Sequence, residues 1–276
     1  MYNLDIGVII PLESLLKNGV QELKDLGLNT CQINGWNCEY FTEENAEKIK
    51  TMVDEHNIKI SSLWVGWPGP AIWDFIDGPS TLGLVPKEFR FERMKALKKG
   101  ADFAKLMGIT DITTHVGFIP ENPSTTEYME TVMIIRDVAR YCKKLGLYFN
   151  FETGQETPIT LLRTIQDIGL DNLGINLDPA NLLMYGKGNP QDAVDMYGEY
   201  IRGVHVKDGM YPTDGRSLGK ETPVGEGMVD FPVLIKKLKE HNYNGALIIE
   251  REISGPQQKE DILKAKALLE EILEKL

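Results

Sequence analysis

The chain has 276 residues, of which 42% are apolar and 26% are charged, and its formal net charge is −11. This length fits one large domain, and this composition is ordinary for a globular protein with a sizeable core. A surface this acidic repels phosphate backbones and no basic stripe offsets it, so we expect no nucleic-acid partner. No apolar run approaches the roughly 20 residues that span a bilayer, so we expect no membrane partner either.

The cysteines and the N-terminus indicate the compartment. The chain has an odd number of cysteines, Cys31, Cys38 and Cys142, and they show no CxxC spacing. This pattern argues against a disulfide framework and against a thiolate metal site. The N-terminal residues lack the basic stretch and the apolar segment of a signal peptide. We therefore expect a cytoplasmic protein, and homo-oligomer formation stays open.

Eight short apolar or alternating runs recur along the chain, and a helical pattern follows each of them. In chain order these runs are residues 4–10, 29–33, 59–65, 111–116, 147–151, 174–177, 203–206 and 246–249. Thr42 is placed as the N-cap of the helix that precedes the third run.

Several predicted helices end with an apolar residue followed by glycine, at Gly27, Gly108, Gly146 and Gly169. Such a glycine forms the left-handed C-cap that turns the chain into the next strand. The repeated order of strand, helix and glycine predicts parallel strands joined by crossover helices. Eight units favour an α/β fold closed into a (β/α)₈ TIM barrel, and we predict one domain over residues 1–276. The missing GxGxxG motif after the first run disfavours dinucleotide binding.

Two long irregular segments follow predicted strands, at residues 66–86 and 208–229. The first is rich in glycine, proline and aromatic residues, including Trp67 and Trp73, and the second carries Arg216. In a barrel both segments would lie at the C-terminal face, where active sites form. We predict that they are ordered lids over a substrate.

Ionisable residues interrupt the apolar sequence near the C-terminal ends of the fifth to eighth runs. They are Glu152, Asp178, His205 and Glu250. A carboxylate that ends a buried strand is costly unless it is paired or bound to a cation. Ion pairing at the barrel mouth is one explanation, but three carboxylates and one imidazole also form a hard ligand set. We predict one bound divalent metal ion, with Mn²⁺ favoured and Mg²⁺, Co²⁺ or Zn²⁺ as alternatives.

His115 stands at the end of the fourth run. Three roles fit this position. His115 could bind a second metal ion, form a hydrogen bond with the substrate, or be a structural residue of the barrel rim with its hydrogen bonds satisfied there. We favour contact with the substrate.

Five motifs occur in a fixed order: ETGQETP (152–158), NLDPAN (176–181), HVKD (205–208), GEGMVDF (225–231) and IERE (249–252). Together they resemble the sugar phosphate isomerase/epimerase family of the xylose isomerase-like barrel superfamily, over essentially the whole chain. In its D-tagatose 3-epimerase-like branch, Glu, Asp, His and Glu at the ends of strands 5 to 8 bind the metal ion. The four residues named above match these positions. The resemblance implies that Glu152 and Glu250 also exchange a proton at carbon.

Two positions depart from that branch. Its substrate-binding histidine, three residues after the aspartate, is Asn181 here, and its arginine after the strand-7 histidine has only an approximate counterpart in Arg216. Lys207 and Asp208 instead resemble the pattern of inosose-processing members.

We predict a metal-dependent sugar isomerase or epimerase. A substrate carbonyl and its neighbouring hydroxyl would chelate the metal ion, which stabilises the enediolate formed when Glu152 or Glu250 removes a proton. Return of the proton to the opposite face gives an epimer, and its return to the adjacent carbon gives an isomer. Predicted contacts with this carbohydrate substrate are His115, Glu156, Asn181, Lys207, Arg216 and Trp67.

Three alternatives remain. Loss of a β-hydroxyl after the same first step would make the chain a lyase, a dehydratase of the inosose or 3-keto-sugar type. A DNA-repair nuclease related to AP endonuclease family 2 would need more histidines than the four present. A non-catalytic binding protein would have no need of the intact pair of glutamates.

Overall fold

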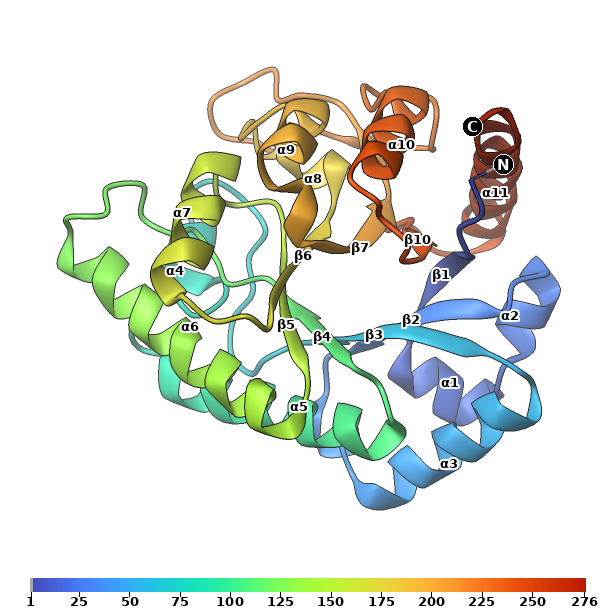
Figure 1. The fold of residues 1–276 in the computed structure, drawn as a ribbon, viewed down its shortest axis with the longest axis horizontal. Coiled ribbons are helices and arrows are strands. Elements are labelled where there is room, and N and C mark those ends of the chain that lie inside the picture. Colours follow the sequence, from blue (N-terminus) through green and yellow to red (C-terminus); the bar gives the residue numbers. More distant parts are fainter. Residues whose placement is uncertain (1) are drawn as a thin grey trace.

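The computed structural model describes residues 2–276, and within them eight strands form one closed parallel barrel (Figure 1). In chain order the barrel strands are β1 (Ile6–Pro11), β2 (Thr30–Gly35), β3 (Lys59–Val65), β4 (Asp111–Thr114), β5 (Tyr148–Glu152), β6 (Leu173–Leu177), β7 (Ile201–Val206) and β10 (Leu247–Ile249). The first strand pairs in parallel with both β2 and β10, which closes the ring. The predicted (β/α)₈ TIM barrel is therefore confirmed.

Helices surround the barrel and connect its strands (Figure 1). They are α1 (Leu12–Asn18), α2 (Gln21–Leu26), α3 (Glu43–Glu55), α4 (Gly78–Thr81), α5 (Arg90–Met107), α6 (Thr126–Leu145), α7 (Pro158–Ile168), α8 (Pro179–Met184), α9 (Pro190–Tyr197), α10 (Phe231–Glu240) and α11 (Pro256–Lys275), with 3-10 turns at Cys38–Tyr40 and Gly198–Tyr200. A separate antiparallel pair is formed by β8 (Asp208–Gly209) and β9 (Glu221–Thr222). None of the helices in residues 2–276 combines the length and the apolar character needed to cross a membrane.

The predicted helix ends are confirmed. The Thr42 side chain accepts a hydrogen bond from the backbone N–H of Asn45 and so caps α3. The four predicted C-cap glycines all adopt the left-handed conformation, after α2, α5, α6 and α7.

The eight predicted strands all exist, with ends shifted by up to two residues. The fourth was expected to reach residue 116 but ends at Thr114. Val116 instead accepts a backbone hydrogen bond from Leu84, in the loop after β3. An apolar residue that is buried by a crossing loop has the same sequence signature as a strand residue, so the pattern overextended this strand.

Alternate residues of each strand face the barrel interior, and much of this interior is polar. Asn150 on β5 donates to Asp111 on β4, and Gln32 on β2 donates to Ser62 on β3 at 2.7 Å. Gly174, on β6, makes room for the side chain of Asn150, because a Cβ at this position would lie 2.3 Å from Oδ1 of Asn150. Side chains two residues apart on a strand share a face, so Glu152, at the end of β5, also points inward.

Candidate metal centre

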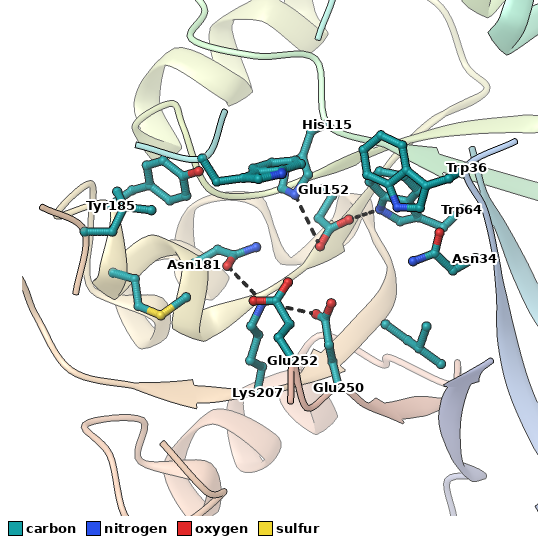
Figure 2. A pocket seen from close by; sticks show the side chains of 14 residues that line it. Asn34, Trp36, Trp64, His115, Glu152, Asn181, Tyr185, Lys207, Glu250 and Glu252 are labelled. Atoms are coloured by element: carbon teal, nitrogen blue, oxygen red, sulfur yellow. Dashed lines mark hydrogen bonds and ion pairs between the residues drawn. The ribbon is translucent and has the colours of Figure 1, made fainter. Parts of the chain in front are cut away.

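The four predicted ligands meet at the C-terminal end of the barrel. Glu152, Asp178, His205 and Glu250 each offer one ligand atom, and these atoms all lie within 4.8 Å of one another. His205 Nδ1 is 3.1 Å from Oε1 of Glu152, 3.0 Å from Oε2 of Glu250 and 3.7 Å from Oδ2 of Asp178. Figure 2 shows the two glutamates on facing sides of the pocket.

The donor atoms of this cluster fit a cation. Asp178 Oδ2, His205 Nδ1 and Glu250 Oε2 are buried and have no hydrogen-bond partner within the described chain. Buried polar atoms are nearly always satisfied, so three orphaned atoms beside one point call for a common partner. Burial alone would lower the pKa of His205, but the neighbouring carboxylates outweigh it and raise this pKa well above its usual value. The same electrostatic field would attract a divalent ion.

Side chains around the cluster orient its members. His205 Nε2 lies 2.8 Å from Oε1 of Gln32, which leaves Nδ1 directed at the carboxylates. The backbone N–H of Asn181 donates to Oδ1 of Asp178 at 2.8 Å, so the aspartate caps α8 and leaves Oδ2 free. The Trp64 indole N–H donates to Oε2 of Glu152, which fixes the other oxygen of this glutamate toward the cluster (Figure 2).

A cavity of about 230 Å³ opens above the cluster. Its lining residues are Ile9, Asn34, Trp36, Trp64, Trp73, His115, Glu152, Asn181, Met184, Tyr185, Lys207, Leu218, Glu250 and Glu252. The structure therefore brings together both glutamates and three of the predicted substrate contacts, His115, Asn181 and Lys207. Both predicted lid segments reach this cavity, through Trp73 and Leu218.

The other three predicted contacts lie outside the cavity lining. Trp67 is buried behind Trp36 and Trp64, with ring centroids 5.4 and 5.8 Å away. Arg216 is exposed in the loop after β7. Glu156 is buried, and within the described residues neither of its carboxyl oxygens has a hydrogen-bond partner. Burial raises the pKa of Glu156 to about 8, so this carboxyl is mostly protonated at neutral pH.

Sequence reasoning placed Trp73 only in a predicted lid and missed several other residues of the site. Trp36, Trp64 and Trp73 form one side of the cavity, which we call the tryptophan wall; Trp36 lies 4.9 Å from Trp64 and 6.4 Å from Trp73 between ring centroids. Gln32 and Glu252 were also missed. A glutamine inside an apolar run was the available signal for Gln32, because its burial needs a polar partner.

Lys207 is a buried cation set among carboxylates. Its Nζ lies 3.1 Å from Glu252 and 3.5 Å from Glu250 (Figure 2). It also lies 3.8 Å from Asp178. Burial alone would lower the pKa of Lys207, but the three carboxylates raise it well above its usual value. The ammonium group therefore stays charged, and it faces the cavity beside the metal cluster.

A closed parallel barrel with a cluster of carboxylates and a histidine at the C-terminal ends of its fifth to eighth strands is a TIM barrel whose C-terminal face could hold a metal ion. Residues 20–272 match the family model described as xylose isomerase-like TIM barrel, and the chain belongs to this family. The resemblance seen in the sequence motifs is thus confirmed.

Several known proteins are similar to this chain. The crystal structure of a xylose isomerase domain protein from Planctomyces limnophilus is 33% identical, with a TM-score of 0.91 over 99% of this chain and 97% of that chain. A D-tagatose 3-epimerase-like protein is 21% identical, with a TM-score of 0.76 over 98% of this chain and 97% of that chain, and shares the fold. An inosose dehydratase of Geobacillus kaustophilus is 30% identical over an alignment of 149 residues, and the match covers 46% of this chain and 46% of that one. The chain spans about half the length of the curated relatives it matches.

Proposed function

We propose that the chain is a divalent-metal-dependent isomerase or epimerase that acts on a sugar or a sugar-derived ketone. The observation that carries this proposal is the convergence of Glu152 and Glu250 with Asp178 and His205 on one point at the floor of the cavity. Two carboxylates on facing sides of a cavity are the groups needed to take a proton from one face of a carbon and return it to another.

In this proposal, metal binding and proton transfer are assigned to different residues of the site. When bound, a divalent ion would act as a Lewis acid that acidifies the C–H bond beside a substrate carbonyl. Asp178 and His205 are held by the backbone of α8 and by Gln32, and we assign them to metal binding alone. Glu152 and Glu250 hold and move the proton. The tryptophan wall and the surrounding side chains limit the access of water.

The nature of the ion belongs to this proposal. Three carboxylate oxygens and one imidazole nitrogen favour Mn²⁺, Mg²⁺ or Co²⁺, and Zn²⁺ also accepts such ligands. We propose Mn²⁺ as the working ion. His115 Nε2 lies 3.5 Å from Glu152 Oε1 at the cavity edge, which supports its role as a substrate contact beside the proton-transferring carboxylate.

A lyase is the second candidate, and Lys207 is the observation that favours it. Its ammonium group lines the cavity 3.5 Å from Glu250. A cation there could stabilise a departing β-hydroxyl after the first proton is removed. The partial match to an inosose dehydratase points the same way.

One experiment separates the two. The Mn²⁺-loaded protein is incubated in D₂O with a panel of ketoses, 3-keto sugars and inososes, and both deuterium incorporation and loss of water are followed. Isomerase or epimerase activity gives deuterium at carbon with no loss of water, whereas a dehydratase releases water. Absence of proton exchange in every ketone that binds to the metal-loaded protein would overturn both.

A further inference from the structure

The cavity above the metal cluster is small for a substrate site. Its volume is about 230 Å³, whereas small-molecule sites usually enclose about 300–1,000 Å³. A larger hollow of about 610 Å³ lies between the segment after β2, the segment after β3 and α5. We call it the outer groove, and it is lined by Trp36, Cys38, Glu39, Trp67, Glu92 and Lys95, among others.

Trp36 borders both the cavity and the outer groove. Its ring centroid lies 4.9 Å from that of Trp64 in the cavity wall (Figure 2) and 5.4 Å from that of Trp67 in the groove. Gly66 permits this close packing, because a Cβ there would lie 2.6 Å from Cε3 of Trp36. The Trp36 side chain is nevertheless 38% exposed. A ligand that extends from the cavity past this indole therefore enters the outer groove.

The groove combines aromatic surface with polar side chains of balanced charge. Its charged residues are Glu39, Glu92, Lys95 and Lys99, which sum to zero, and Glu92 and Lys95 are paired at 3.2 Å. Asn37 and Glu39 add an exposed amide and an exposed carboxylate. Such a surface suits a sugar ring, whose C–H groups can pack on an indole while its hydroxyls bond to carboxylates and amides.

We propose that the outer groove is a second sugar subsite, so that the substrate is a glycoside whose keto-sugar ring occupies the metal cavity and whose second ring packs on Trp36. The proposal rests on the proposed function, because it extends the substrate of the same site. The indole shared by the two hollows and the small volume of the cavity carry it.

Binding to the Mg²⁺-loaded protein, measured by calorimetry, tests the proposal. The probes are D-fructose and three of its glucosides, turanose, maltulose and isomaltulose, which carry the second ring at different hydroxyls. At least one disaccharide should bind at least about tenfold more tightly than D-fructose, because its second ring covers apolar indole surface. If none of the three exceeds D-fructose by this factor, the proposal is overturned.

A variant of the groove locates the second ring. Glu39→Ala removes a carboxylate that lines the groove and does not line the cavity. It should weaken disaccharide binding by about 3- to 10-fold, the contribution of one hydrogen bond, and leave the affinity for D-fructose unchanged. Glu47→Ala, at an exposed position of α3, is the matched control and should change neither. A disaccharide affinity that Glu39→Ala leaves unchanged, or equal losses for both sugars, contradicts the proposal.

Cys38 reports on the groove without any need for turnover. Its side chain is partly exposed there, whereas Cys31 and Cys142 are buried, so iodoacetamide should label Cys38 selectively. A bound disaccharide should slow this labelling, as measured by mass spectrometry, and D-fructose should not. Equal protection by D-fructose overturns the proposal. Protection that appears when the sugar-free protein is concentrated also overturns it, since a second copy of the chain would then cover the groove.

Failure of the proposed function gives a different result. A disaccharide would then bind more tightly than D-fructose and protect Cys38, but it would exchange no proton in D₂O. Failure of the subsite alone leaves proton exchange in a keto sugar with no gain from a second ring.

Discussion

His205 Nε2 lies 2.8 Å from Gln32 Oε1, so a side chain of β2 orients a candidate metal ligand of β7 across the barrel interior. Hydrogen bonds of this kind fix the tautomer of a ligating histidine. Gln32→Leu removes the acceptor and should lower the affinity for Mn²⁺ by about 10- to 100-fold, as measured by calorimetry. Gln21→Leu, an exposed glutamine on α2, is the matched control. Unchanged affinity in Gln32→Leu would show that the contact does not orient the ligand.

Glu250 combines a ligand position with exposure to the cavity. Its side chain is 16% exposed, whereas that of Glu152 is 3% exposed, so Glu250 is the more accessible of the two proposed bases. Glu250→Gln should weaken metal binding and slow deuterium exchange at least about 10²-fold, the contribution of one acid–base group. The exchange rate in D₂O is the measurement, made at saturating Mn²⁺. Glu260→Gln, on the outer helix α11, is the control for the loss of one charge. Near-normal exchange in Glu250→Gln would show that Glu250 does not transfer the proton.

The indole of Trp64 donates a hydrogen bond to Glu152. A hydrogen bond to a charged group contributes about 1.5–3 kcal/mol, so Trp64→Phe should reduce turnover by about 10- to 100-fold while it keeps an aromatic ring in the wall. Steady-state kinetics check this. Trp67→Phe should have a smaller effect, because the Trp67 indole nitrogen is buried without a hydrogen-bond partner in the described residues. Equal losses in both variants would point to packing rather than to the bond with Glu152.

Glu156 should make folding stability depend on pH. Burial raises its pKa to about 8 from the usual 4.5 of a glutamate in an unfolded chain. The folded chain therefore holds a proton that the unfolded chain releases, so the stability from this group is complete below pH 4.5 and is lost as pH rises toward about 8. One proton corresponds to about 1.4 kcal/mol per pH unit. Urea unfolding at several pH values in this window measures the slope.

Glu156→Gln isolates this effect, because glutamine is a neutral group of the same shape. Its free energy of unfolding should fall less steeply with pH than that of the parent protein, since other groups, such as His205, titrate in both chains. Parallel slopes in the two proteins would mean that Glu156 is ionised in the fold.

The strand pattern and the four ligand positions could be predicted from the sequence, for a local reason. A strand buried against helices is apolar on its outer face, and a charged residue at its end is expensive unless it has a partner. Glu152, Asp178 and Glu250 therefore stand out in the sequence itself. Parallel strands of a barrel direct their C-terminal ends to one face, so consecutive strand ends predict spatial neighbours.

Contacts between distant segments could not be predicted in this way. Residue type favours Trp67 as a substrate contact, and the family resemblance favours Arg216, but the cavity is lined by Trp73 and Leu218 of the same loops. Which residue of a loop reaches a cavity depends on the path of the loop, and that path depends on contacts that periodicity does not contain.

The sequence by itself determined the barrel, the positions of its helix caps and the four candidate ligands, because each depends on spacing along the chain or on the cost of a buried charge. Only the tertiary structure decided the shape and charge of the cavity above them. Asp208 accepts hydrogen bonds from backbone N–H groups of the loop after β7, as far as 21 residues along the chain, and the indole N–H of Trp64, on β3, donates to Glu152. Such contacts are made when separate elements pack, so their geometry exists only in the closed barrel.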